Sequence, residues 1–493
     1  MNKYLVLLLL FCANFSFGKV SVEKDLGLNF SADTVKVVLQ GTNNSGTDTK
    51  NLQIALNTKI KAGYLKIYLK GNFQISSVVT TISDNTILSF DKKSKLSFVN
   101  ETSGILINKN SCIIENGFFS GTGKSTRSFY DGYGILMLGA SKCIIRNNRF
   151  DNISGVNIMM VPNKNIGCQD NIIRNNVFTN PKIETSKNEG DDAVILMGYS
   201  GDGYFNSNNI IENNQLEGNN IPKIGIGIIG HGRDNIINNN KISGFRHYGI
   251  IAYESVYTDK SLSGTVITNN TVENIGNWEG AKTYKGMGIY LMKSRNSKII
   301  GNKIYNVLKS SDEKETLGPG AISVSLSPET IISDNVIENS YMYGIVSDYS
   351  FNSKFINNQI RDVRKSGAYF INMNDVDVMG NTFQNIGEVV IKGYFENTSL
   401  QYIKDQMQTD KYLNLDTGNN FIIKNNKFYT KGNVLCFSGT GADKAKKYIG
   451  NKVKRNVFES NEIIGNTKKQ EEIVSFKEEN TGSNLVQKNK ITK

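Results

Sequence analysis

Lys223, Arg246, His247 and Tyr248 are the residues of this sequence best suited to proton transfer. His247 is one of only two histidines in 493 residues, and Arg246 and Tyr248 adjoin it in the segment "FRHYG". Imidazole, amine and phenol groups exchange protons when their neighbours shift their pKa values, and lysine or arginine neutralises a substrate carboxylate. Together these residue types indicate acid–base chemistry on an acidic substrate, provided that the fold brings Lys223 to the other three.

Asp191 and Asp192, in the segment "EGDDAVILMG", offer a second chemistry. Two carboxylates at a suitable separation hydrolyse glycosidic bonds, one as an acid and the other as a base or nucleophile. With Glu189 they also present oxygen ligands of the kind that Ca²⁺ prefers. No cysteine or histidine spacing suggests zinc. We therefore expect no cofactor, with Ca²⁺ as the one cation that these acids could bind.

A repeated sequence motif predicts which secondary-structure elements position these residues. It reads apolar residue, two variable residues, asparagine, one variable residue, apolar residue, as in "IIRNNRF" and "IINNNKI". The aligned asparagines are Asn148, Asn176, Asn214, Asn240, Asn270, Asn302, Asn335, Asn358, Asn381, Asn426, Asn461 and Asn489. Short β-branched runs bounded by Asn and Gly predict strands. Three such strands in about 23 residues make one rung of a parallel β-helix, and its stacked asparagines are expected to bond from rung to rung.

A β-helix must cover its open end, and residues 48–63 supply a candidate N-terminal cap helix. Its buried face is predicted to contain Leu52, Ile54, Ala55, Leu56 and Ile60. Together with the segment "YLKIYLKGNFQIS" that follows it, this N-terminal part of the coil resembles the start of the pectate-lyase-like superfamily of right-handed β-helices. The resemblance implies an all-β, single-stranded right-handed parallel β-helix of about 12–14 rungs, formed by residues 19–493 as one domain. Residues 397–415 are expected to form a helical insertion.

Aligning the strands midway between the asparagines predicts which residues become neighbours. The inward positions are expected to be Ile226, Ile250, Ile289, Ile322 and Ile345, with Val194 in the rung before Ile226. The column that follows from this register contains Asp191, Lys223, His247 and Gly286. On either side of it the same register predicts the columns Gly190, Pro222, Arg246, Lys285 and Asp192, Ile224, Tyr248, Met287. Mixed charges on consecutive rungs perturb proton affinities, although a solvated ladder of paired charges has the same pattern.

The second histidine, His231, does not pair with His247 in this register. His231 follows its strand, whereas His247 precedes the strand of the next rung. They differ by eight residues along the strand direction, which is about 26 Å at roughly 3.3 Å per residue. His231 is therefore expected to contact substrate rather than to act with His247.

Insertions on the rungs around this column predict a groove. Residues 180–190, 275–287 and 308–320 precede the strand in question, and residues 254–264 follow it. Long loops on one edge of a rigid scaffold are usual places for binding. The expected substrate-binding residues are Tyr253, Glu254, Trp278, Tyr284, Lys285, Tyr290, Lys293 and His231, with Tyr253 and Tyr290 on the groove floor.

The net charge and the N-terminal segment indicate which kinds of molecule the protein could bind and where it is located. The net charge is +12 and the pI about 9.1, which favours an anionic polymer but is also met as a general solubility bias. No nucleic-acid-binding module is recognisable. Residues 1–18 have the pattern of a secretory signal peptide. A lipoprotein signal through Cys12 is the alternative, although Leu-Leu-Phe before it lacks the small residues usual at that place. We expect a monomer that is secreted, periplasmic or at the cell surface, not inserted in a membrane.

Four cysteines remain beyond residue 18, at positions 112, 143, 168 and 436. Cys112 and Cys143 occupy matching repeat positions. We therefore expect stacked buried thiols rather than disulfides.

These observations favour an enzyme that cleaves a uronic-acid polysaccharide by β-elimination. Lys223 and Arg246 resemble the lysine base and the arginine on neighbouring rungs of the β-helical alginate and chondroitin lyases. Hydrolysis remains an alternative, because "EGDDAVILMG" resembles the Gly-Asp-Asp segment of polygalacturonases. Epimerisation at C5 begins with the same proton abstraction as elimination. A non-catalytic polysaccharide-binding protein or adhesin is the remaining alternative.

Overall fold

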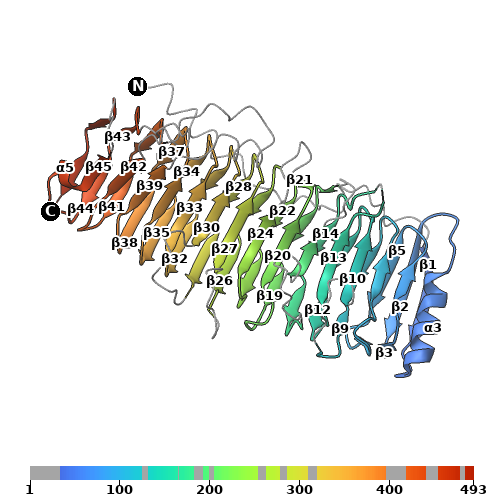
Figure 1. The fold of residues 1–493 in the computed structure, drawn as a ribbon. Helices are drawn as coiled ribbons and strands as arrows, with labels where there is room; N and C mark the ends of the chain where they lie inside the picture. The colour runs from blue at the N-terminus through green and yellow to red at the C-terminus, as the bar shows by residue number, and fades with distance from the viewer. Residues whose placement is uncertain are drawn as a thin grey trace, which may run out of the picture.

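The repeated phrases fold into three parallel β-sheets that wind around one long axis (Figure 1). The computed structural model describes residues 34–124, 132–164, 166–182, 193–198, 205–253, 263–277, 286–308, 319–395, 418–439, 453–477 and 483–492. Within them, successive coils contribute strands to sheets A, B and C, which contain 16, 15 and 14 strands. The right-handed parallel β-helix is therefore confirmed, slightly longer than the 12–14 rungs expected.

The three sheets are defined by the following strands. Sheet A contains β1 (Thr34–Gln40), β2 (Tyr64–Lys70), β5 (Thr86–Phe90), β8 (Ile113–Glu115), β11 (Ile144–Arg146), β14 (Ile172–Arg174), β18 (Ile210–Glu212), β22 (Ile236–Asn238), β25 (Val266–Thr268), β28 (Lys298–Ile300), β31 (Ile331–Ser333), β34 (Lys354–Ile356), β37 (Val376–Met379), β40 (Phe421–Lys424), β43 (Val457–Glu459) and β46 (Leu485–Gln487). Sheet B contains β3 (Asn72–Ile75), β6 (Lys95–Phe98), β9 (Phe118–Ser120), β12 (Arg149–Asp151), β15 (Val177–Thr179), β19 (Gln215–Glu217), β23 (Lys241–Ser243), β26 (Thr271–Ile275), β29 (Lys303–Val307), β32 (Val336–Ser340), β35 (Gln359–Val363), β38 (Thr382–Ile386), β41 (Lys427–Tyr429), β44 (Glu462–Ile464) and β47 (Lys490–Thr492). Sheet C contains β4 (Val79–Thr81), β7 (Ile105–Ile107), β10 (Tyr133–Leu138), β13 (Val156–Val161), β16 (Ala193–Met197), β20 (Ile224–Ile229), β24 (Tyr248–Tyr253), β27 (Met287–Met292), β30 (Gly320–Ser325), β33 (Tyr343–Asp348), β36 (Ala368–Ile371), β39 (Ile391–Phe395), β42 (Leu435–Gly439) and β45 (Val474–Lys477). A small pair, β17 (Asn206–Ser207) and β21 (Gly232–Arg233), lies beside them.

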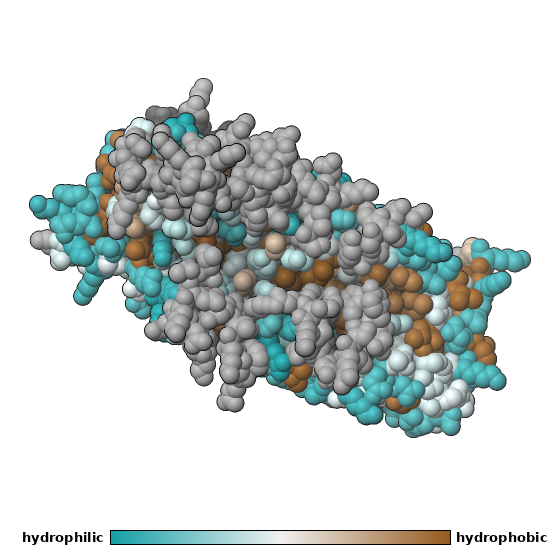
Figure 2. Space-filling view, viewed as in Figure 1, coloured by the Kyte–Doolittle hydropathy of each residue, from teal (hydrophilic) through white to brown (hydrophobic). Residues whose placement is uncertain are grey.

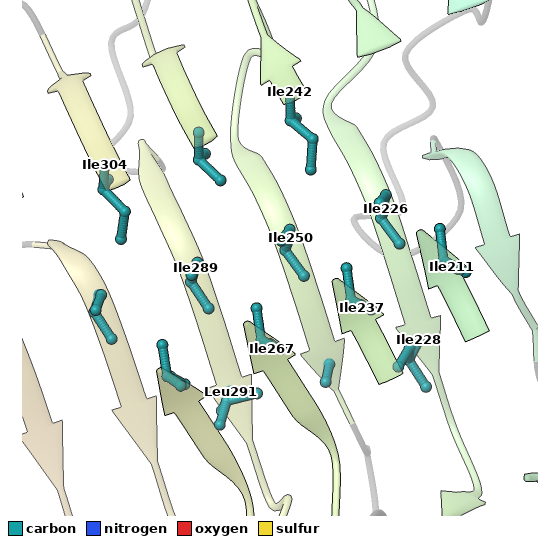
Figure 3. Packing of buried hydrophobic residues seen from close by; sticks show 14 of the residues in the cluster. Ile211, Ile226, Ile228, Ile237, Ile242, Ile250, Ile267, Ile289, Leu291 and Ile304 are labelled. Carbon is teal, nitrogen blue, oxygen red and sulfur yellow. The ribbon is translucent and has the colours of Figure 1, made fainter. Parts of the chain in front are cut away.

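The core fills the inside of the coil with columns of aliphatic side chains. Ile226 of sheet C, Ile237 of sheet A and Ile242 of sheet B are fully buried, and their counterparts stack along the axis (Figure 3). Alternate residues of a strand point to opposite faces, so every second residue enters this core. The inward column Ile226, Ile250, Ile289, Ile322 and Ile345 is confirmed by the strand pairing.

The repeated asparagines form an internal ladder at the turn between sheets A and B. From Asn148 to Asn461, each Nδ2 donates to Oδ1 of the aligned asparagine in the next rung at 2.9–3.1 Å. The same oxygen also accepts the preceding asparagine's backbone N–H. In the rung before Asn148, Gly117 occupies the ladder position, and its backbone N–H donates to Oδ1 of Asn148 at 2.8 Å.

One part of the predicted register is wrong by a residue. Ile195, not Val194, pairs with Ile226, and Ala193 pairs with Ile224. Counted back from these pairs, the position that matches Lys223 is 192 rather than 191, and both lie outside the described residues. The chain between β16 and β20 contains an insertion, and the repeat pattern does not determine how many residues that insertion adds to the rung.

The N-terminal cap is a helix, α3 (Ser45–Leu56), which is shorter than residues 48–63 and starts earlier. Asn44 caps it by accepting the Thr47 N–H at 2.9 Å. Leu52, Ala55 and Leu56 are buried, but Ile54 is 57% exposed, so its assignment to the buried face is wrong. At a turn of about 100° per residue, position 54 points away from a face centred on positions 52, 55 and 56.

The cysteines are free thiols as expected, and Cys112, Cys143 and Cys168 are buried, but Cys436 is only half-buried. The Cys112 N–H donates to Sγ of Cys143 at 3.4 Å. A second short helix, α5 (Gln470–Ile473), precedes β45. Among the described residues, no helix is long and apolar enough to span a membrane. The predicted signal peptide (1–18) and helical insertion (397–415) lie outside the described residues.

Candidate functional site

The first group of predicted site residues lies where the strands of sheet C begin. The β20–β24 register aligns Lys223 with His247, and the His247 N–H donates to the Lys223 carbonyl at 3.0 Å. Arg246 is placed one residue earlier, with its N–H on the Pro222 carbonyl at 3.0 Å. Its side-chain Nε donates to the Asn220 carbonyl at 2.7 Å, which anchors the guanidinium at this turn. The structure therefore brings Lys223, Arg246 and His247 together, as predicted.

His247 is held in its neutral form by this environment. Burial, followed by the positive charges of Lys223 and Arg246, lowers the pKa of His247 to about 4. Each effect penalises the imidazolium: burial removes its hydration, and the two cations repel it. Within the described part of the chain, Nδ1 of His247 has no hydrogen-bond partner. At neutral pH this imidazole is consequently an unprotonated proton acceptor between two cations.

Two tyrosines continue from His247 across the outer face of sheet C. The rings of His247 and Tyr248 meet edge to face at 6.0 Å, and Tyr248 stacks on Tyr290 of the next rung at 5.7 Å. Burial raises the pKa of Tyr248 to about 12 and raises that of Tyr290 as well. Tyr290 also donates to the sulfur of Met292 at 3.2 Å. Both phenols stay protonated at neutral pH, so they can give up a proton to a developing base.

The remaining described residues of the prediction lie at the opposite ends of the strands. Tyr253 and Lys293 are at the end of β24 and just beyond β27, and Lys293 is only 3% exposed. His231 follows β20, and its ring lies 6.0 Å from that of Phe205. The two histidines are therefore separated along the strands, as expected. The structure divides the predicted residues between the two edges of sheet C.

The outer face of sheet C, between the two ends of its strands, is more apolar than the aromatic groove floor that we predicted. Tyr253 and Tyr290 do lie on it, but most of its cluster is aliphatic or otherwise apolar. The described members are Val156, Met159, Val161, Ala193, Leu196, Ile224, Tyr248 and Ile251, packed with Leu136, Leu138, Ile229, Tyr253, Met287 and Tyr290. Hydrophobic surface is visible in the middle of the face in Figure 2. A sugar ring would therefore meet polar groups mainly at the strand ends.

Sequence reasoning missed an acidic group at the end of β33. Asp348 accepts a hydrogen bond from the Ser325 hydroxyl of the neighbouring rung at 2.8 Å. Burial raises the pKa of Asp348 to about 6, with Ser325 opposing that shift, and the carboxyl in turn helps to raise the pKa of Tyr290. The only signal was a strand that ends in aspartate, "YGIVSD", two rungs beyond Tyr290.

Replacing Asp348 with asparagine is expected to stabilise the fold above neutral pH. Because the native pKa, about 6, exceeds the unfolded value of about 4, the native state binds this proton more tightly. Its contribution to stability is present below about pH 4 and is lost as the pH rises through about 6. Asp348→Asn should raise the free energy of unfolding by about 1–3 kcal/mol at pH 8 and change it little at pH 4.

Thermal unfolding at both pH values measures this effect. Asp334→Asn, at an exposed turn, is the matched control and should show no such difference between the two pH values. Equal destabilisation by Asp348→Asn at pH 4 and pH 8 would contradict the assignment.

Several predicted residues lie outside the described part of the chain. They are Asp191, Asp192, Glu254, Trp278, Tyr284 and Lys285, together with the proposed Ca²⁺ ligand Glu189. Among the described residues, no group of three His, Cys, Asp or Glu side chains is arranged to bind a metal ion. The paired-carboxylate and Ca²⁺ hypotheses therefore stay predictions from sequence.

Comparison with known proteins supports the fold. The family model described as "right handed beta helix region" matches residues 226–399. The surface adhesin PfbA of Streptococcus pneumoniae is similar over 74% of this chain and 93% of its own, with 13% identity and a TM-score of 0.55. The A-module of the mannuronan C-5 epimerase AlgE6 of Azotobacter vinelandii is similar over 95% of this chain and 98% of its own, with 13% identity and a TM-score of 0.49. The periplasmic alginate epimerase AlgG is similar over 96% of this chain and 89% of its own, with 13% identity and a TM-score of 0.45. No curated protein matches the sequence. The likeness to PfbA, at 13% identity, shows the coiled architecture alone, as the resemblance to the pectate-lyase-like superfamily implied.

Proposed function

We propose that this protein is an exported enzyme that acts on a uronic-acid polysaccharide by removing the proton at C5, most simply in a β-elimination. One observation carries the proposal: His247 is neutral and lies directly beside Lys223 and Arg246 at the start of sheet C. A reaction that removes a proton next to a carboxylate needs a base together with cations that neutralise the carboxylate. These three side chains meet that requirement at the same position of two neighbouring rungs.

The roles follow from the geometry and the charges. Lys223 and Arg246 bind the uronate carboxylate, which makes the C5 proton acidic. His247 accepts that proton, the C5–H electrons form the C4–C5 double bond, and the C4–oxygen bond breaks. Tyr248, kept protonated by its raised pKa, gives a proton to the leaving oxygen. Binding of the substrate carboxylate also offsets the repulsion from the two cations, so His247 becomes a stronger base in the complex.

This assignment changes one role that the sequence suggested. The resemblance to alginate and chondroitin lyases implied Lys223 as the base, but Lys223 is only 6% exposed and shares its register position with an unprotonated imidazole. A neutral histidine accepts a proton at pH 7, and the lowered pKa of His247 keeps it neutral there. Lys223 is therefore proposed as a carboxylate-binding cation, with Arg246 in the same role.

A panel of uronic-acid polymers, including pectate, alginate and chondroitin, tests the proposal. We expect new absorbance near 235 nm, from the unsaturated product, together with new reducing ends for at least one polymer. New reducing ends without absorbance would instead support hydrolysis. Deuterium exchange at C5 without chain cleavage would support epimerisation, which shares the proposed first step. If no polymer is changed in any assay, the catalytic proposal fails and binding alone remains.

A further inference from the structure

A polar groove runs along the turn between sheets B and C, at the ends of the sheet B strands. It consists of two adjoining hollows of about 380 and 700 Å³, which share Asn220 and Asn274 in their linings. The described lining extends from β19 through β38, along the lower margin of the molecule in Figure 1. The groove predicted from the sequence had Tyr253 and Tyr290 on its floor. This groove includes Asn277 and Leu308 from the insertions that bordered the predicted one, but it lies beside the ends of sheet B rather than over the apolar face of sheet C.

The groove is lined by a second ladder of polar side chains, distinct from the internal asparagine ladder. Five consecutive rungs place Asn274, Asn306, Asn339, Asp362 and Asn385 at one register position. All five have a left-handed backbone with a positive φ. Asparagine and aspartate tolerate that conformation better than most residues. The shared backbone conformation gives their side chains the same starting direction on every rung.

Hydrogen bonds between rungs orient these amides. Asn306 Nδ2 donates to Asn274 Oδ1 at 3.2 Å, Asn339 Nδ2 to Asn306 Oδ1 at 2.6 Å, and Asn385 Nδ2 to Asp362 Oδ1 at 2.7 Å. An amide nitrogen carries two N–H groups, and an amide oxygen has two lone pairs. Each ladder contact uses one of them. Oriented donors and acceptors are thus repeated along the groove at the rung spacing of about 4.8 Å.

Two further groove residues have acceptors without donors. Within the described residues, the Oδ1 atoms of Asn220 and Asn277 have little contact with solvent and no hydrogen-bond partner. The Asn277 amide is oriented by its Nδ2, which donates to the Asn306 carbonyl at 2.8 Å. Sheltered polar atoms of this kind are normally paired. A ligand that supplies hydroxyl donors would satisfy them.

The charges on the groove wall show no excess of cations. In the larger hollow, the charged residues of the described lining are Asp362 and Arg364. The smaller hollow adds one cation and two anions, Lys241, Glu217 and Glu273. The Arg364 guanidinium lies 4.4 Å from the ring centroid of Tyr341 and donates to its hydroxyl, which holds this aromatic ring against the groove wall. Amides and an aromatic ring without surplus positive charge match the hydroxyls and apolar faces of sugars better than they match a dense polyanion.

We propose that this groove is a carbohydrate-binding site for an extended glycan that lies along the helix axis. Its ring hydroxyls would bond to the amides of Asn274, Asn306 and Asn339, with about one sugar for each rung. The inference goes beyond the proposed function, because it requires neither His247 nor turnover.

Replacing two ladder amides tests this site. In Asn306→Gly/Asn339→Gly, glycine keeps the left-handed backbone without strain and removes both side chains. The matched control is Asn239→Gly/Asn357→Gly, at exposed left-handed positions of the turn between sheets A and B. The probes are six-residue oligomers of β-1,4-linked glucose and of α-1,4-linked galacturonate. Binding is measured by calorimetry at low and high salt, and located by hydrogen exchange.

We expect wild type to bind the glucose oligomer, with less than about a twofold change in affinity between about 0.05 and 0.5 M salt, because the recognition is uncharged. The ladder variant should bind about 30-fold more weakly and the control within about twofold, since two hydrogen bonds of about 1 kcal/mol each are lost. Hydrogen-exchange protection should fall on residues 303–308 and 336–341.

Absence of binding to the glucose oligomer, equal affinity of the ladder variant and wild type, or protection only at residues 223–229 and 246–253 would each overturn the inference. Turnover is measured separately on the polymer panel. Loss of the groove site and failure of the proposed catalytic function therefore have different signatures.

Discussion

Replacing His247 with glutamine is expected to lower turnover of the uronic-acid polymer by about 10²–10⁴-fold, the usual contribution of a general base. Glutamine keeps the size and polarity of the side chain but cannot accept the C5 proton at neutral pH. Lys223 and Arg246 remain in place, so the KM for the polymer should change much less than kcat. Initial rates at 235 nm measure the effect, and thermal unfolding verifies that the variant is folded.

The pH profile distinguishes a base from a residue that only supports the fold. Because the pKa of His247 in the free enzyme is about 4, its unprotonated form predominates above that pH. The kcat/KM of wild type should therefore rise with pH through about 4 and level off towards neutrality. Lys223→Ala removes one of the two cations that lower the pKa of His247, so this rise of kcat/KM at acidic pH should move to higher pH.

The control for both measurements is Lys298→Gln, an exposed lysine on sheet A. It should retain the rate and the pH profile of wild type. Undiminished turnover in His247→Gln, or an acid limb that does not respond to Lys223→Ala, would remove His247 from the mechanism.

Replacing Asn358 with alanine is expected to lower the free energy of unfolding by about 3–9 kcal/mol, because three buried groups lose a partner at about 1–3 kcal/mol each. Oδ1 of Asn358 accepts from the backbone N–H of Asn335 at 3.1 Å and from its Nδ2 at 2.9 Å. Its own Nδ2 donates to the Ile332 carbonyl at 2.9 Å. Water cannot reach these groups, since Asn358 and Asn335 are fully buried. Chemical denaturation followed by circular dichroism measures the loss.

The neighbouring residue supplies the control. Asn357 occupies the same turn with a left-handed backbone, but its side chain is exposed. Asn357→Gly keeps that backbone conformation and should change stability by less than about 1 kcal/mol. If the two variants were equally stable, the internal ladder would not be a major source of stability.

The repeat pattern was sufficient to predict the coiled scaffold and much of its register. Asn148 and its eleven counterparts recur with apolar neighbours, and only a stacked turn uses a buried amide on every rung. The same periodicity predicted that Ile226, Ile250 and Ile289 point inward, because side chains alternate between the two faces of a strand. It also predicted that Lys223 and His247 are neighbours, since no long insertion separates β20 from β24.

The repeat pattern could not predict the strand register across an insertion or which face of the cap helix is buried. The step along the chain from Ile195 to Ile226 is longer than the step from Ile226 to Ile250, and the pattern did not distinguish Val194 from Ile195 as the partner of Ile226. Ile54 was assigned to the buried face of α3 from its hydrophobicity, yet the packing of the helix against β3 and β4 leaves it exposed.

What the sequence determined by itself was local and periodic: the strands, the inward aliphatic columns, the asparagine ladder and the pairing of Lys223 with His247. What only the tertiary structure decided depends on burial and on contacts across many rungs. Asp348 becomes a weak acid because neighbouring groups exclude water from it, and Asn274, Asn306 and Asn339 line one groove because unequal insertions still return the chain to the same turn. Hydrogen-bond register along a strand is encoded in nearby residues, whereas dielectric environment and groove shape belong to the assembled coil.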